Sequence, residues 1–589
     1  MQIKPRYPLE PSSRRCRSWS RDSRVSGSRI LSVVVWVGLL VPFHTTVVAA
    51  ADRTTPFLPL SQEAAVSAVS MNSLLPDAAL GGRASAGWQA YMQLWQAHHS
   101  DPANASIRRF LGLPLKKSFE ASAKRGRTAP SWLRWRPGTF AQVDTPHFTI
   151  YSRADEQSSK HVAEDLERCY WVWTQMFFPL WEANAQVSGA FRDWKPGQDV
   201  CEYLEGRSQR ITVRRRLRVV LFRDADEYRK TLGPENPGIE RSTGFYNDQR
   251  QTTFLYADET DDAATRRHEM VHQLFREATR SGLGRGVPGE ASGFWLIEGI
   301  AGYFESLHLD DQIATVGGWD APRMQFARYR VLVGGDVMPM AELEQDGRVA
   351  AQQRSDIARW YAHAILRTHQ LMDAERPDQR QWLYKQLAER YRIKGGELME
   401  APPVDRNQLD QQLRAFLAID DQHLKDNPVT HGLSQLCLAG CEVTEQGIAG
   451  IPASPELRWL DLARLPVGNT EVQRLAPNPE TMEQLTLEVT RIDQDLVPWL
   501  KRATQLREVD LSWTRSDDSA INALDEARGI STLWMTGTRL TDNSIASIAK
   551  MKQLESVDLQ RTGVTEAGIQ RLKATRPQLE INPLELRTQ

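Results

Sequence analysis

Short apolar segments in the middle of the chain predict a sheet with helices between its strands. These segments are rich in β-branched and aromatic residues and are bounded by polar turns, which is typical of strands. A longer segment, 156–182, places its apolar positions three and four residues apart and predicts a helix. The predicted strands are 147–151, 217–222, 244–246 and 252–256, the last two being candidates for a hairpin.

Helices are expected to dominate the next part of the chain. From about 262 to 423 apolar positions recur at helical spacing, and the Asn-Pro pair at 427–428 is a candidate linker. Together with the strands, this pattern predicts an α+β domain over 141–423. Residues 52–140 are expected to form a helical and linker region, in which the basic stretch 116–136 is interpreted as a solvated linker.

The last part of the chain, 431–589, repeats itself. The frame apolar-x-x-apolar-x-apolar returns with steps of 24, 25, 24, 24 and 24 residues. These steps match the period of about 20–29 residues of leucine-rich repeats. Each repeat is expected to supply a strand and then a helix, capped by Thr541 and Thr565 in two of them. Because no repeat buries its apolar face alone, stacking would form an α/β solenoid. The frames begin at Leu433, Leu457, Met482, Leu506, Ile530 and Leu554.

The N-terminus has the organisation of a secretory signal peptide. Residues 1–29 are basic and polar, residues 30–43 are almost all apolar, and small residues follow up to Ala51. The apolar run is shorter than the roughly 20 residues that span a bilayer. We therefore expect 1–51 to be a cleaved signal peptide and the mature chain to be exported, whether secreted, periplasmic or on the cell surface. Left uncleaved, the segment would anchor the chain in a membrane.

The charge balance argues against a nucleic-acid partner. The chain carries 73 Lys and Arg against 74 Asp and Glu. Residues 1–51 hold eight of the basic residues and two of the acidic ones. The rest of the chain is left with 65 basic and 72 acidic residues, whereas a dedicated nucleic-acid binder is expected to be basic. With 41% apolar and 25% charged residues, the composition is that of a globular protein.

Four cysteines remain after Cys16 leaves with the signal peptide. Export permits disulfides. The sequence therefore leaves two possibilities for Cys169 and Cys201, which are a disulfide between them or two free thiols. Cys437 and Cys441 are interpreted as packing residues within a repeat. No Cys-x-x-Cys pair occurs in the sequence, which argues against a thiolate zinc site.

A candidate metal site lies in residues 268–272, which read His-Glu-Met-Val-His. His268 and His272 are four residues apart, so on a helix they share one face, one turn apart. Two imidazoles in this arrangement can bind one metal ion. Glu269 beside them is then placed to accept a proton from metal-bound water.

A carboxylate within an apolar segment is the candidate third ligand. Glu298 lies 26 residues after His272, in the middle of the otherwise apolar stretch 294–304. A buried ionised glutamate is costly unless it is paired or binds a metal. We therefore expect Glu298 to complete the ligand set. Glu305, two helical turns further on, is expected to hold a ligand imidazole through its other nitrogen.

These motifs resemble the gluzincin metallopeptidases, in particular the aminopeptidase-type catalytic core and its peptidase MA-like relatives. The resemblance rests on His268-Glu-x-x-His272 and on Trp295-Leu-x-Glu298-Gly. It is strongest over 245–305 and covers neither the repeats nor residues 52–140. It implies a zincin-like fold. The exopeptidase signature of the family is not found, so no aminopeptidase specificity is implied.

The resemblance also implies roles for single residues. Zn²⁺ would be held by the two histidines and Glu298, and Glu269 would be the general base. Family members place a tyrosine downstream that stabilises the oxyanion. Tyr361, at the start of an apolar segment, is the candidate for this role, and His363 is the second choice.

The sequence therefore predicts an exported zinc-dependent peptidase-like hydrolase that acts on peptides or proteins, with leucine-rich repeats that bind a protein partner. The alternative is a catalytically inactive peptidase-like scaffold in which the repeats are the working part. A glycan hydrolase has no support from a paired-carboxylate pattern.

Overall fold

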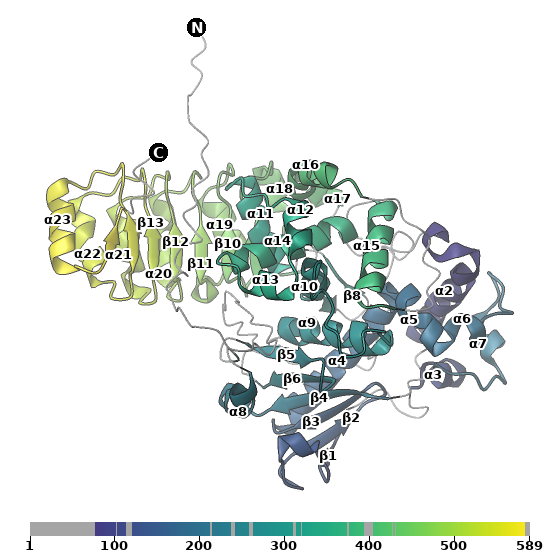
Figure 1. Ribbon diagram of the computed structural model, residues 1–589. Helices are drawn as coiled ribbons and strands as arrows, with labels where there is room; N and C mark the ends of the chain where they lie inside the picture. Colours follow the sequence, from purple (N-terminus) through teal and green to yellow (C-terminus); the bar gives the residue numbers. More distant parts are fainter. Residues whose placement is uncertain are drawn as a thin grey trace. The chain divides into compact units, whose positions relative to one another are not determined.

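The computed structural model describes residues 77–582 apart from short gaps, so the predicted signal peptide, 1–51, lies outside the described residues. Among the helices that are described, none is both long and apolar enough to cross a membrane. Contacts divide the chain into two units (Figure 1). The first contains the described residues up to 321 together with 338–409, and the second contains 322–337 and the residues from 410 onward. The gaps are 102, 114–120, 212–214, 237–238, 240–241, 258–262, 310–313, 318, 320, 374–375, 394–403, 427 and 430.

A six-stranded mixed sheet is the centre of the first unit, with the strand order β1-β2-β3-β4-β6-β5. The neighbours β3, β4 and β6 run parallel, and the remaining pairs are antiparallel. Strand β5 therefore forms one edge of the sheet. The strands are β1 (Ser122–Arg125), β2 (Ala141–Asp144), β3 (Phe148–Ser152), β4 (Leu217–Phe222), β5 (Gly244–Asn247) and β6 (Thr252–Tyr256).

The sheet begins earlier in the chain than the apolar pattern predicts. Residues 122–125 were expected in a solvated linker, but they form β1 and pair with β2. The strand reads Ser-Ala-Lys-Arg and is mostly exposed, so it has no buried alternate positions to reveal it. Its hydrogen bonds to β2, and not a buried side-chain row, define it as a strand.

Helices cover both faces of the sheet. Along β4 the side chains of Val219 and Leu221 enter the main hydrophobic core, while Val220 and Phe222 enter a smaller cluster. This alternation follows from the two-residue period of a strand. Helices α4 (Glu156–Met176) and α9 (Ala263–Gln273) contribute to the main core, and α8 (Ala225–Leu232) contributes to the smaller cluster.

Helix α10 (Phe294–Phe304) packs against both α9 and α14 (Ile357–Asp373), and every residue of α10 is buried. Its closest approach to α14 is at Gly299 and Gly302, where a Cβ atom would meet side chains of α14. The other helices of the unit are α2 (Asp77–Ser100), α3 (Ala105–Leu111), α5 (Phe178–Ala185), α6 (Val187–Ala190), α7 (Val200–Leu204), α12 (Met340–Gln345), α13 (Arg348–Gln352) and α15 (Pro377–Arg390). A two-stranded ribbon joins β7 (His308–Leu309) to β8 (Ala314–Thr315).

Gly299→Ala is expected to destabilise the first unit. A Cβ at this position would lie 2.1 Å from Oγ1 of Thr368 and 2.7 Å from the carbonyl oxygen of Ala364. Overpacking of this kind typically costs about 1–3 kcal/mol, which chemical denaturation monitored by circular dichroism would measure. Gly189→Ala is the control, because its Cβ would meet only Cβ of Gln186, at 3.9 Å. Equal stability of Gly299→Ala and the wild type would contradict the close packing.

The second unit contains a seven-stranded, all-parallel sheet in the order β9 to β15 (Figure 1). Equivalent residues pair along it, so Leu436 is level with Leu460 and Leu460 with Leu485. Paired residues are therefore 24 or 25 positions apart in the sequence, which confirms the predicted repeat. The strands are β9 (Gln435–Cys437), β10 (Trp459–Asp461), β11 (Gln484–Thr486), β12 (Glu508–Asp510), β13 (Thr532–Trp534), β14 (Ser556–Asp558) and β15 (Glu580–Ile581).

Short helices follow the strands of the repeats, and threonines cap several of them. Thr541 and Thr565 accept hydrogen bonds from main-chain amides in the first turn that follows, as the sequence predicts. The helices are α18 (Glu445–Ala449), α19 (Asn469–Leu475), α20 (Val497–Arg502), α21 (Asp518–Ala523), α22 (Ile545–Lys550) and α23 (Glu566–Thr575), preceded along the chain by α16 (Arg406–Leu417) and α17 (Asp421–Asp426).

The start of the parallel sheet is covered by α11 (Pro322–Leu332), a helix from the middle of the chain. Its Gln325 side-chain oxygen accepts a hydrogen bond from the N–H of Cys437, and Arg328 donates one to the carbonyl of the same residue. The helix therefore satisfies backbone groups of β9 that a further repeat would otherwise pair. The four described cysteines are all free, so the option of a Cys169–Cys201 disulfide is not realised.

Candidate metal centre

Two buried helices bring the predicted ligands together. His268 and His272 lie one turn apart on α9, and Glu298 lies in the middle of α10, which packs against α9. One ligand atom from each residue can be chosen so that all three lie within 4.8 Å of one another. Exposure of the three residues is 1%, 7% and 1%, so the cluster is shielded from bulk solvent.

The ligand atoms converge on one point. Nε2 of His268 lies 3.4 Å from one carboxylate oxygen of Glu298, and Nε2 of His272 lies 3.7 Å from the other. The two Nε2 atoms are 3.2 Å apart. Neither carboxylate oxygen of Glu298 has a hydrogen-bond partner within the part of the chain that the structure describes.

This geometry fits a metal ion better than it fits a self-contained polar cluster. Buried carboxylate oxygens without hydrogen bonds are costly, and a cation between the three groups would satisfy them. Two imidazole nitrogens and one carboxylate are a ligand set that zinc uses in catalytic sites, with a fourth position left open. The residues present therefore fit the metal that the sequence predicts.

Glu305 lies behind the first histidine. It forms the C-terminal cap of α10, and its Oε1 is 2.8 Å from Nδ1 of His268. A carboxylate at this nitrogen orients the ring and leaves Nε2 directed at the cluster. This is the contact that the predicted role of Glu305 requires.

Glu269 is held from the edge strand of the sheet. Its Oε2 accepts a hydrogen bond of 2.7 Å from the main-chain N–H of Tyr246 on β5. Its Oε1 has no hydrogen-bond partner among the described residues, and the side chain is fully buried. One oxygen is therefore fixed while the other can take part in chemistry. The sequence could not reveal the contribution of Tyr246, because a main-chain amide leaves no side-chain signature.

The residues of the cluster have pKa values shifted in different directions. Burial alone lowers the pKa of His268, but the neighbouring carboxylates of Glu298 and Glu305 outweigh it and raise the value to about 10. Burial lowers the pKa of His272 to about 3. Burial raises the pKa of Glu269 to about 8, while the nearby histidines outweigh burial and lower that of Glu298.

Tyr361 and His363 both lie in α14, and both are buried. The ring of Tyr361 packs edge-on against Trp360, which stacks on Phe294 at the start of α10. The predicted oxyanion role of Tyr361 stays a prediction. A second tyrosine, Tyr391, escaped the sequence analysis. Its hydroxyl is buried and has no hydrogen-bond partner in the described chain.

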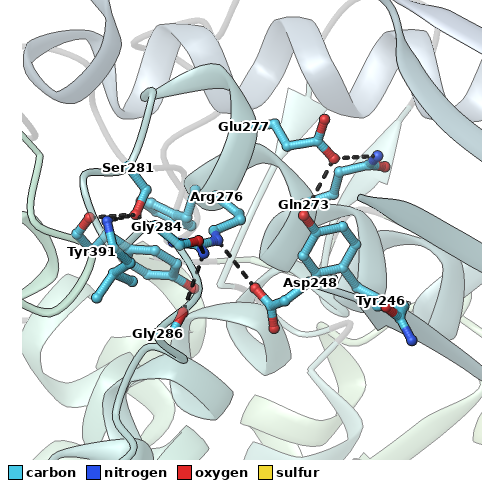
Figure 2. A network of polar contacts seen from close by, with 12 residues as sticks. Tyr246, Asp248, Gln273, Arg276, Glu277, Ser281, Gly284, Gly286 and Tyr391 are labelled. Atoms are coloured by element: carbon cyan, nitrogen blue, oxygen red, sulfur yellow. Dashed lines mark hydrogen bonds and ion pairs between the residues drawn. The ribbon is translucent and has the colours of Figure 1, made fainter. Parts of the chain in front are cut away.

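A buried polar network lies beside the centre (Figure 2). The helix that carries the histidines continues as a π-helical turn, Leu274–Ala278, a feature often found at functional sites. From this turn Arg276 pairs with Asp248 at 3.2 Å. Nearby, Glu277 accepts hydrogen bonds from Gln273 at 2.8 Å and from the hydroxyl of Tyr246 at 3.3 Å.

Glu277→Gln is expected to remove a pH-dependent loss of stability. Burial raises the pKa of Glu277 to about 7 from an ordinary value of 4.5. The folded chain therefore binds this proton more tightly than the unfolded chain. The resulting stabilisation is complete below about pH 4.5 and is lost as pH rises through 7. Between pH 5 and pH 8 the variant should gain about 2–3 kcal/mol relative to the wild type.

Denaturant unfolding of both chains at the two pH values would measure this difference. Glu290→Gln is the matched control, because Glu290 is an exposed carboxylate of the same unit. A constant difference between Glu277→Gln and the wild type across this range would contradict the buried, protonated state.

Comparisons with known proteins assign no family to this chain. No family model matches the chain, and no curated protein does either. Among solved structures, the crystal structure of an internalin (inlF) from Listeria monocytogenes matches with 14% sequence identity and a TM-score of 0.20. The match covers 25% of this chain and 47% of that one, so the chain spans about half the length of the internalin. A match at this level says nothing about activity or partners.

Proposed function

We propose that the chain is a zinc-dependent peptidase-like hydrolase of the gluzincin type. His268, His272 and Glu298 would hold the metal, and Glu269 would act as the general base. The observation that carries the proposal is the Glu298 carboxylate, which is buried, accepts no hydrogen bond from a described residue, and lies next to two imidazole nitrogens that face each other. A structural role for Glu298 would be expected to supply hydrogen-bond donors to its oxygens.

A bound zinc ion supplies Lewis acidity and lowers the pKa of water at its open position toward ~7. The chain supplies the proton transfer. One oxygen of Glu269 is fixed by Tyr246, and the other has no hydrogen-bond partner among the described residues. The residue is next to His268 in the chain. It can accept a proton from the attacking water and return it to the leaving amine. We further propose Tyr361 as the group that stabilises the oxyanion.

The repeat unit is proposed to bind a protein, either the substrate or a separate partner. One position in each repeat has a left-handed backbone, and at Val489 and Trp513 this places a large side chain on the surface. These two are 48% and 42% exposed and, with Val349, are the exposed large hydrophobic residues of the described chain. Exposed apolar groups of this kind often mark protein contacts. The proposal includes export of the mature chain after removal of 1–51.

The test is hydrolysis of a broad peptide library by the purified chain, followed by mass spectrometry. The chain is assayed as isolated, after removal of metal by a chelator, and after zinc is returned. We expect cleavage that is lost without metal and restored with zinc. If the zinc-loaded chain cleaves no library peptide, the alternative of an inactive scaffold with a working repeat unit becomes the better interpretation.

A further inference from the structure

Arg348 lies between helix α10, which carries Glu298, and Asp248, the residue that follows strand β5. It is the first residue of α13, and its guanidinium lies over the ring of Phe294, 5.9 Å from the centroid. Phe294 begins α10, one helical turn before Glu298. On its other side, Nη1 of Arg348 is 4.0 Å from Oδ2 of Asp248, two residues after the Tyr246 amide that holds Glu269.

The side chain of Arg348 is largely buried, and its Nε has no hydrogen-bond acceptor among the described residues. Its side chain is 8% exposed, its Nε is buried without a partner, and Asp248 at 4.0 Å is beyond hydrogen-bonding distance for its Nη1. Among the described residues, no acceptor forms a hydrogen bond with this side chain. An arginine keeps its charge in a protein, so a buried guanidinium left in this way is costly.

Arg276 shows what a buried arginine with a structural role looks like in the same place (Figure 2). It also pairs with Asp248, but it donates to the Ser281 hydroxyl as well. Its remaining donors reach the carbonyl oxygens of Gly284 and Gly286. Asp248 is shared by the two arginines, and the charge of Arg348 also acts on the carboxylates of Glu298 and Glu269. Unlike Arg276, Arg348 donates no side-chain hydrogen bond to a described residue.

A second unmet donor belongs to the same neighbourhood. The Tyr391 side chain is buried, and no described residue is a hydrogen-bond partner of its hydroxyl. Burial raises the pKa of Tyr391 well above its usual value, with further contributions from the charges of Asp248 and Glu298. The ring of Tyr391 stacks on Phe275, which precedes Arg276 in the chain, and Arg276 pairs with Asp248 (Figure 2). The Tyr391 hydroxyl stays protonated and can donate a hydrogen bond.

We propose that Arg348 and Tyr391 bind a carboxylate of the peptide substrate beside the metal centre. This inference rests on the proposed peptidase function and adds a substrate class to it. A carboxylate can accept two parallel hydrogen bonds from a guanidinium and a further one from a phenol, which satisfies the donors left unmet. Such a carboxylate exists at the C-terminus of a peptide and on the side chains of aspartate and glutamate. Arg348 and Tyr391 are thus specificity-determining residues.

The experiment measures binding without turnover, by calorimetry on the full zinc-loaded chain carrying Glu269→Gln. One pair of probes is N-acetyl-tetra-alanine with a free C-terminal carboxylate or with an amide. The other pair is an N-acetylated peptide amide with a central glutamate or glutamine. We expect roughly 10- to 100-fold tighter binding of the charged member in at least one pair, and that pair identifies the source of the carboxylate.

Substitutions test whether the two residues cause this preference. Arg348→Gln should abolish the difference between charged and neutral peptides, Tyr391→Phe should reduce it by about tenfold, and Arg348→Lys should restore part of it. Arg285→Gln, which removes an exposed charge of the same unit, should leave it unchanged. Circular dichroism and zinc content show that each variant is folded, and Tyr391→Phe keeps the test decisive should Arg348→Gln fail to fold.

Two results would overturn the inference. One is equal binding of the charged and neutral members in both pairs. The other is an equal loss for charged and neutral peptides in Arg348→Gln, which is what a purely structural arginine predicts. A carboxylate preference without any hydrolysis by the wild type would remove the proposed function and leave the binding site, whereas hydrolysis without the preference would do the opposite.

Discussion

Glu269→Gln is expected to leave the metal content of the chain unchanged and to lower peptide hydrolysis by at least about 100-fold. Loss of a general base typically costs about 10²–10⁴ in rate. The substitution keeps the shape of the side chain, and its amide oxygen can still accept the hydrogen bond from Tyr246. The fold around α9 should therefore survive, and only the proton acceptor is lost.

The measurement pairs elemental analysis with the rate of cleavage of one peptide found in the library. Glu290→Gln, an exposed carboxylate of the same unit, is the control for the loss of one negative charge. If Glu269→Gln and the wild type cleave the peptide at the same rate, Glu269 is not the base. If the variant also loses its zinc, Glu269 acts as a ligand and the division of roles is wrong.

His272→Ala is expected to lower zinc affinity by more than about 100-fold. The reason is that the site has three ligands. Within the described residues, ligand atoms come together in the group His268, His272 and Glu298. Removing one of three ligands leaves two, which cannot fix the geometry of a catalytic zinc site. Competition with a chelating dye of known affinity would measure the change.

Glu305→Gln provides a graded comparison for this result. Its contact with Nδ1 of His268 orients a ligand without touching the ion, and loss of such a partner typically costs about 10- to 100-fold in affinity. His423→Ala, in the repeat unit, should have no effect. Equal zinc affinity in His272→Ala and the wild type would exclude the proposed centre.

Features that depend on spacing along one helix or strand could be predicted from the sequence alone. Two histidines four residues apart share a helix face whatever surrounds them, and an apolar frame returning every 24 or 25 residues must stack to bury its leucines. For the same reason Glu298, a charged residue in an apolar segment, was singled out before its neighbours were known. The register of the parallel strands agrees with the repeat of the apolar frame. The ligand atoms on α9 and α10 lie close together, as the spacing of the histidines and the position of Glu298 led us to expect.

Features that depend on contacts between distant segments came only from the tertiary structure. Strand β1 has no apolar alternation and exists because β2 pairs with it. The amide of Tyr246 reaches Glu269 only because the edge strand lies against α9. Arg348 looks like an ordinary surface arginine in the sequence, and its burial between Phe294 and Asp248 is set by segments about 50 and 100 residues away. Local periodicity records which face of an element is buried, but it does not record which distant residue that face will meet.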